Sequence, residues 1–135
     1  YWPYWQGEDG LFTAWIALSD VGQDAGPMCF VRGSQRWGFI GEGDFFSSNQ
    51  AALQTQISSS TDAVWEECAA LLPAGGVSLH HCLTFHGSHA NTSASARCSL
   101  AVHLRDERAT SVPGSDNYYV SHLDEPAYSP VIYGG

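Results

Sequence analysis

The sequence predicts an all-β domain, a sandwich or barrel of short strands. Short apolar stretches alternate with turns rich in Gly, Pro and Ser along most of the 135 residues, and this pattern is typical of such folds. The sequence contains no long amphipathic helix and no internal repeat. A compact chain of this size buries about two thirds of its unfolded surface, so an apolar content of 44% is enough for a core.

The N-terminal half predicts two strands, a loop and a helix. Residues 13–18 and 28–31 are the strands, and a turn over residues 22–26 joins them. Residues 33–50 are rich in Gly, Ser and Asn, which predicts a long loop of the kind that forms active-site lids. Residues 51–57 predict a short helix.

The C-terminal half continues the β pattern and then changes character. Its predicted elements are a strand over 64–72, a turn over 73–76, and strands over 77–82 and 97–104. Residues 105–135 are polar and interrupted by Pro and Gly. We therefore expect a core over residues 1–104 and an extended C-terminal tail over 105–135 that packs on it.

Alternation along the strands separates a polar face from an aliphatic face. If Arg97 and Trp15 point into the barrel, small and polar side chains line its interior and leave room for a ligand. The aliphatic faces then point outward and need a cover, which is normally a layer of helices. These faces carry Ile16, Leu18, Leu100 and Val102.

The composition excludes several classes of partner. A net charge of −9, with five basic residues, argues against nucleic acids and anionic membranes. The four cysteines form no Cys-x-x-Cys pair, so we interpret them as small apolar side chains and not as a disulfide framework. No apolar run reaches 18 residues and no signal peptide is visible. We expect a cytoplasmic protein, or an organellar one if a targeting segment precedes residue 1.

The segment from His86 to Arg97 has the clearest chemistry. A neutral His suits a divalent metal such as iron, and the hydroxyl of Ser88 follows His86 two positions later. Arg97 opens an apolar strand and offers a planar fork that binds a carboxylate in two places. The segment therefore combines a metal ligand with a clamp for an acid, as a metal enzyme with a keto-diacid co-substrate requires.

This motif resembles the phytanoyl-CoA dioxygenase family, a branch of the Fe(II)/2-oxoglutarate oxygenases. The family pattern is His-Gly-Ser with Asn five and Arg eleven positions after the His, and the matching residues are His86, Gly87, Ser88, Asn91 and Arg97. Residues 13–20 and 26–35 resemble the family's Trp-Ile-Ala-Leu-Asp-Asp strand, Gly turn and Val-Pro-Gly-Ser-His hairpin. Because both motifs occur in the expected order, the resemblance spans most of residues 1–104.

The chain departs from the family at some turns and at one essential motif. Ser19, Arg32, Gln35 and the pair Gly75-Gly76 stand where the family has Asp, Pro, His and Gly-Asp. The His-x-Asp motif that supplies two further iron ligands is absent. In the family it lies shortly before a Tyr/Trp-rich stretch, and residues 1–5 form such a stretch. The simplest interpretation is a fragment that begins just after these ligands, with residues 1–104 as the C-terminal part of a larger domain.

The resemblance implies a double-stranded β-helix, or jelly roll, in partial form. It implies that the parent protein is an Fe(II)- and 2-oxoglutarate-dependent oxygenase, or hydroxylase, that acts on a small-molecule or lipid-like substrate, with ascorbate as a candidate further cofactor. In this interpretation His86 binds iron, Arg97 and Ser88 hold the distal carboxylate of 2-oxoglutarate, and Trp15 forms a wall of that site. With one of three iron ligands, the isolated chain is expected to be inactive, and its uncovered aliphatic faces favour self-association.

Other signals are less specific. The side chains that could line a substrate pocket are Tyr1, Trp2, Tyr4 and His81, which could equally be packing residues. A zinc site built from His80, His81, His86 and His89 matches no common ligand spacing. The alternative function is a non-catalytic jelly-roll module that binds a small ligand or a partner, which the absent His-x-Asp favours if the chain is complete.

Overall fold

The computed structural model describes residues 4–40, 50–60, 64–118 and 120–134, which fall into two compact units. Unit 1 comprises Tyr1–Leu11 and Arg105–Gly135, and unit 2 comprises Phe12–Leu104. Among the described residues, strands predominate, with one α-helix and three short 3-10 helices. No helix in these ranges is long and apolar enough to cross a membrane. The predicted all-β fold is confirmed.

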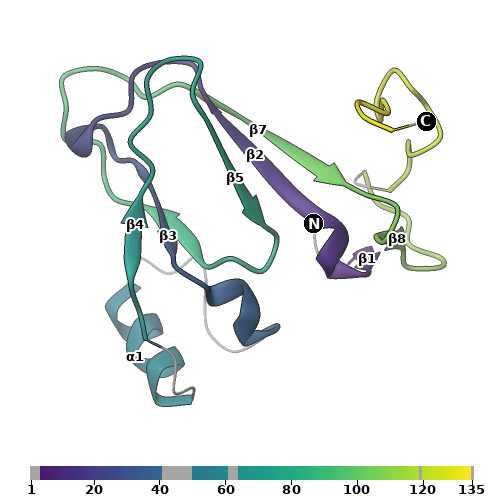
Figure 1. The fold of residues 1–135 in the computed structure, drawn as a ribbon, viewed down its shortest axis with the longest axis horizontal. Coiled ribbons are helices and arrows are strands. Elements are labelled where there is room, and N and C mark those ends of the chain that lie inside the picture. Colours follow the sequence, from purple (N-terminus) through teal and green to yellow (C-terminus); the bar gives the residue numbers. More distant parts are fainter. Residues whose placement is uncertain (1–3, 41–49, 61–63, 119, 135) are drawn as a thin grey trace. The chain divides into compact units, whose positions relative to one another are not determined.

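Two three-stranded sheets form the body of unit 2 (Figure 1). The first has the order β5 (Val77–His81), β2 (Leu11–Ala17), β7 (Ser99–Arg105). The second has the order β4 (Glu67–Ala69), β3 (Met28–Val31), β6 (His86–Ser88). Strands β2 and β3, which are consecutive along the chain but for a turn, therefore occupy the centres of different sheets, as expected for a β-sandwich.

A small apolar core holds the turn end of β2 in place. Trp15, Ala17 and Val21 are buried, and Met28 and Leu72 pack against them. The β-bridge between Val21 and Leu72 continues this packing beyond the strand end. Ala17 is fully buried because its small side chain fits where β2 turns toward β3.

Most predicted elements are present, with shifted ends. Residues 28–31 form β3 as predicted, and the predicted helix is α1 (Gln50–Ser60). The strand predicted over residues 64–72 is confined to β4, and part of the predicted 33–50 loop is a 3-10 helix, η4 (Ser34–Trp37). The rest of that loop, over residues 41–49, lies outside the described residues.

The predicted aliphatic face of the β5-β2-β7 sheet does point outward. Pairing of Ala14 with Leu79 and of Ile16 with Val77 places these side chains on one face. The exposed fractions are 70% for Leu79 and 50% for Val77. The exposed fraction is 59% for Leu18, which follows β2, and 51% for Leu100, which lies on β7. Within the described residues of unit 2, this face has no complete cover.

Unit 1 is built on a short antiparallel pair, β1 (Trp5–Gln6) with β8 (Thr110–Ser111). Leu11 and Ala109 are buried in it. A Cβ on Gly10 would lie 2.8 Å from the backbone nitrogen of Ala109, so the backbone of unit 1 would have to shift to accept any other residue. The predicted division at residue 104 stays a prediction.

Candidate functional site

The facing sides of the two sheets in unit 2 bring a group of rings together. Phe30 of β3 and His80 of β5 have ring centroids 4.9 Å apart. The rings of His80 and His86, the latter from β6, are 4.6 Å apart. The register pairs His80 with Thr13, so this cluster lies on the same side of the first sheet as Thr13 and Trp15.

His86 lies on a strand and not at the turn that its motif suggested. It pairs with Phe30 across β6 and β3. Its Nδ1 donates a hydrogen bond to the carbonyl oxygen of Thr84 at 2.7 Å. Because the neutral ring carries one N–H, this bond leaves the lone pair of Nε2 available to a metal, which is the usual way in which proteins orient a histidine ligand.

The strand start at His86 is fixed by the buried Ser34. The Ser34 hydroxyl donates to the carbonyl of Val31 at 2.8 Å and accepts the amide N–H of Phe85 at 2.8 Å. The amide of Val31 in turn donates to the carbonyl of Phe85 at 2.9 Å. The residue before His86 is therefore held through its amide and its carbonyl to the end of β3 and to Ser34.

Arg97 lies just before β7 and is half-buried. Its guanidinium carbon lies 5.4 Å from the ring centre of Trp15, in cation–π contact. One of its N–H groups donates to the carbonyl of Gly26. Among the described residues no carboxylate forms an ion pair with Arg97, although the chain has 14 acidic residues. Trp15 and Gly26 thus orient this cation, and none of the carboxylates in the described ranges neutralises it.

The turn that presents the Gly26 carbonyl requires glycine. Gly26 has φ of 66°, and a Cβ there would lie 2.6 Å from the carbonyl oxygen of His89. The carbonyl of Asp24 accepts the amides of Thr92 and Ser93 at 2.8 and 3.1 Å. The loop that leads to Arg97 is therefore docked against the turn before β3.

Asn91 organises this loop through its side chain. Its Nδ2 donates to the carbonyl of Ser95 at 2.8 Å, and its Oδ1 accepts the amide of Ser93 at 2.9 Å. These bonds hold the turn between residues 91 and 95, which is a common role of an Asn side chain.

Two buried polar atoms on the interior side of β5 have no hydrogen-bond partner in the described chain: Nδ1 of His80 and Oγ of Ser78. Burial, and next the neighbouring His86 and His103, lower the pKa of His80 from 6.5 to about 4, so the ring is neutral at pH 7. Unpartnered buried polar groups are costly. A polar ligand or water between the sheets would satisfy both.

The structure places the other predicted site residues as follows. Trp15 is 5% exposed, beneath Arg97. Ser88 is exposed on β6 and pairs with Met28. His81 lies on the face opposite His80, where its ring meets Phe12 at 5.9 Å and its Nδ1 accepts the amide of Leu83 at 3.1 Å. His80, which the sequence did not single out as a pocket residue, is therefore the histidine beside His86.

The assignment of the remaining pocket candidates stays a prediction. Tyr4 belongs to unit 1, where its carbonyl accepts the amide of Val112 at 2.9 Å. Tyr1 and Trp2 lie outside the described residues.

The described residues fit an iron site in part. His86 offers Nε2, and the orphaned atoms of His80 and Ser78 face the same interior. Within the described ranges, one group of three His, Cys or acidic side chains is close enough to hold a metal, and it contains neither His86 nor His80. Of the two histidines and one carboxylate that such an iron site needs, the described residues offer one candidate, the imidazole of His86.

The chain is similar to solved structures of non-haem enzymes, of which SnoK and SnoN are described as dependent on α-ketoglutarate. The carbocyclase SnoK from nogalamycin biosynthesis is 33% identical, with a TM-score of 0.60 over 84% of this chain and 43% of that chain. The epimerase SnoN from the same biosynthesis is 26% identical, with a TM-score of 0.59 over 81% of this chain and 39% of that one. The non-haem monooxygenase ThoJ is 26% identical, with a TM-score of 0.61 over 83% and 39%.

The fold of this chain is that of the jelly-roll enzymes that use iron and 2-oxoglutarate, the class to which SnoN and SnoK belong. The sequence model of phytanoyl-CoA dioxygenase matches residues 1–99, so the chain belongs to the phytanoyl-CoA dioxygenase family, which uses Fe(II) and 2-oxoglutarate. No functionally curated protein matches significantly. The chain spans about two fifths of the length of the structures that it matches.

Proposed function

We propose that the protein is an Fe(II)- and 2-oxoglutarate-dependent oxygenase that acts on a small-molecule substrate. The observation that carries the proposal is Arg97, a cation that Trp15 and Gly26 orient and that no carboxylate of the described residues pairs with, in a chain of net charge −9. Such a cation suits the distal carboxylate of 2-oxoglutarate, because a guanidinium fork binds a carboxylate at two points. Family membership and the SnoN complex with Fe3+ and α-ketoglutarate support the proposal.

His86 is the proposed iron ligand of this chain. The Thr84 carbonyl fixes its tautomer and ring orientation, so Nε2 is presented without a rearrangement on binding. Iron with 2-oxoglutarate supplies the oxidative chemistry, and the protein holds and orients both. Ser88 is proposed to assist Arg97 with the carboxylate, and Trp15 to form a wall of the co-substrate site.

The reaction itself is proposed at the level of oxidation of a small molecule. The neighbours are named as an epimerase, a carbocyclase and a monooxygenase, so this fold supports several outcomes from the same co-substrate. A lipid-like acyl compound is the substrate class that the family name suggests for this chain.

Substitution of Arg97 tests the co-substrate role in the protein expressed from its complete reading frame. Arg97→Ala should weaken 2-oxoglutarate binding by roughly 10- to 100-fold, because a charge-assisted hydrogen bond contributes about 1.5–3 kcal/mol. Arg97→Lys should restore little of it, since the fork is lost. Titration calorimetry with 2-oxoglutarate measures the change, and Arg36→Ala is the matched control. Wild-type affinity in Arg97→Ala would contradict the assignment.

A second candidate function is a non-catalytic jelly-roll module that binds an acidic ligand. It is favoured by the single imidazole that the described residues offer to iron. In the same protein, His86→Ala should abolish both Fe(II) binding and succinate production if the enzyme proposal holds. If 2-oxoglutarate binds the wild type equally well with Fe(II) and with a chelator, and no succinate forms, the binding module is the better description.

A further inference from the structure

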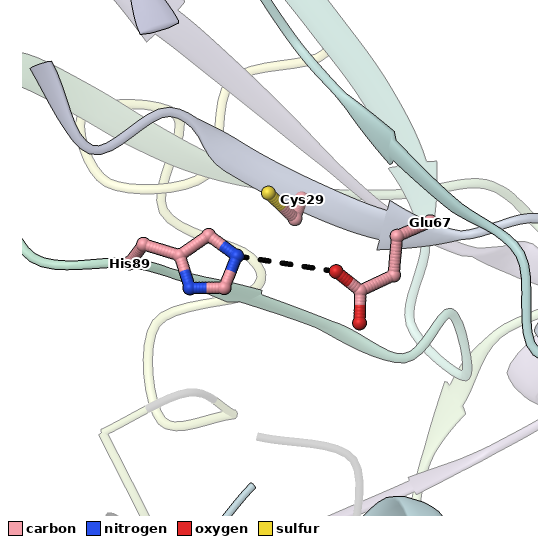
Figure 2. A group of neighbouring side chains, drawn as sticks. All are labelled: Cys29, Glu67 and His89. Atoms are coloured by element: carbon pink, nitrogen blue, oxygen red, sulfur yellow. Dashed lines mark ion pairs between the residues drawn. The ribbon is translucent and has the colours of Figure 1, made fainter. Parts of the chain in front are cut away.

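A second group of metal-binding side chains lies on the opposite side of the β4-β3-β6 sheet from His86. Cys29 is on β3, Glu67 is on β4, and His89 directly follows β6 (Figure 2). Strand alternation separates the two groups: Phe30 and His86 are paired and face the first sheet, whereas Cys29 pairs with Gly87 and faces away. The group is therefore outside the proposed iron and 2-oxoglutarate site.

The ligand atoms of these three residues are already close. They all lie within 4.8 Å of one another, and His89 Nε2 is 3.9 Å from Glu67 Oε2. Donors around a tetrahedral zinc ion are about 3.3–3.7 Å apart, given metal–ligand distances of about 2.0–2.3 Å. The His89 and Glu67 side chains are 65% and 43% exposed, so small rotations of exposed side chains close the remaining gap.

The backbone fixes the base of the group. Cys29 lies in the middle of the central strand, and Gly87 opposite it has no side chain to fill the space above the sheet. The carbonyl of His89 is packed against Gly26, where a Cβ would approach within 2.6 Å. Two strands and the residue that follows the third thus bring one ligand each to one place.

We propose that Cys29, Glu67 and His89 bind a zinc ion on the outer face of the β4-β3-β6 sheet. A sulfur, a nitrogen and an oxygen donor suit zinc, whereas Ca²⁺ and Mg²⁺ require oxygen ligands. Three protein ligands leave a fourth position for water. The ion would link β3, β4 and β6, and would stabilise the folded unit by mass action.

Zinc binding at this site is coupled to release of a proton. Burial, then the charge of Glu67 and then Cys68, raise the pKa of the Cys29 thiol, and its Sγ is 3.8 Å from the carbonyl of Pro27. The metal-free thiol is therefore protonated at neutral pH. When zinc binds, the S–H bond breaks, a Zn–S bond forms and the proton passes to the buffer, with no change of oxidation state. The Glu67 carboxylate, which opposes the thiolate without metal, becomes a ligand with it.

Cobalt is the probe that reports on the thiolate ligand. Co²⁺ added to the chain of residues 1–135 under reducing conditions should give a thiolate-to-metal absorption band that saturates at one equivalent, and Zn²⁺ should abolish it by displacement. Cys29→Ala should remove the band, and Glu67→Gln and His89→Gln should each weaken Co²⁺ binding by about tenfold or more. Proton release on Zn²⁺ addition should be lost in Cys29→Ala.

Two controls separate this site from other metal binding. Cys98→Ala removes another exposed thiol and should leave the band unchanged, as should His86→Ala, which removes the proposed iron ligand. Glu67 and His89 are exposed, so their variants keep the test valid if Cys29→Ala fails to fold by circular dichroism. The proposal is overturned if the wild type shows no band, if Cys29→Ala retains it, or if Glu67→Gln and His89→Gln bind Co²⁺ as tightly as the wild type.

Discussion

The two faces of the β5-β2-β7 sheet reverse the usual distribution of side chains. The inner face carries Thr13, Trp15 and His80, all buried, with Arg97 over the Trp ring. The outer face carries aliphatic side chains, and Leu79 is 70% exposed. An antiparallel sheet with one solvated face normally turns its apolar side chains to the core and its polar ones to water.

This reversal indicates a different role for each face of the sheet. Buried polar atoms without partners cost free energy, so a sequence retains them where a ligand will meet them. Several exposed aliphatic side chains on one face are typical of a surface that another element or chain covers. The inner face is therefore the side on which we propose that the ligand binds, and we expect the outer face to be covered.

The sharpest test of this contrast compares one large apolar side chain from each face. Trp15→Ala should lower the free energy of unfolding by about 3–5 kcal/mol, because a buried aromatic is removed and a cavity is left. Leu100→Ala, at a side chain that is 51% exposed, should change it by less than about 0.5 kcal/mol. Urea denaturation followed by fluorescence and circular dichroism measures both. Equal losses would show that the outer face is packed in solution.

The buried His80 makes stability depend on pH in a defined window. Its pKa is about 4 in the folded chain and about 6.5 in an unfolded one, so between these values the unfolded state binds more protons. The free energy of unfolding of the metal-free chain should therefore fall by up to about 3 kcal/mol as the pH drops from 6.5 to 4. Above pH 6.5 this contribution is constant.

His80→Gln should flatten that part of the stability curve, because it removes the buried imidazole. The Asp106 carboxyl titrates in a lower range, because its hydrogen bonds with Arg108 lower its pKa from 3.8. Thermal unfolding in a chelator-containing buffer series measures the slope. An unchanged slope in His80→Gln would show that His80 does not carry the effect.

The outer face should drive self-association of the isolated chain. Leu79→Glu should weaken it by tenfold or more, since burying a leucine contributes about 1.5–3 kcal/mol. Val64→Glu places the same charge at a side chain that is 80% exposed and belongs to no strand, and should leave association unchanged. Sedimentation velocity over a concentration series distinguishes the two. If the wild type stays monomeric at high concentration, the outer face does not drive self-association and the prediction is wrong.

The sequence predicted the strands better than it predicted which residues meet. Residues 28–31 were predicted with their observed bounds because glycines at 26 and 33, both with positive φ, terminate the strand on each side. Strand β6 was missed, since three residues that include a glycine carry no alternation signal and pair with a strand far away in the sequence.

The adjacent histidines show what a sequence alone leaves open. Alternation states that His80 and His81 point to opposite faces, but the choice between them depends on the pairing of Thr13 with His80. That register is set by contacts between distant segments, so His81 was the predicted pocket residue and His80 is the one beside His86. The sequence motif placed Arg97 and Trp15 on the same interior side, which agrees with the stacking of Arg97 on Trp15. It did not predict that the carbonyl of Gly26 would anchor Arg97.

The anchoring of Arg97 has a consequence for affinity. A free arginine side chain samples many rotamers, and fixing it on binding costs up to about 2 kcal/mol of conformational entropy. Here the ring of Trp15 and the carbonyl of Gly26 select one arrangement when the chain folds. If Arg97 binds the carboxylate as proposed, the acid meets a preorganised fork, and more of the Coulombic attraction is retained as net binding free energy.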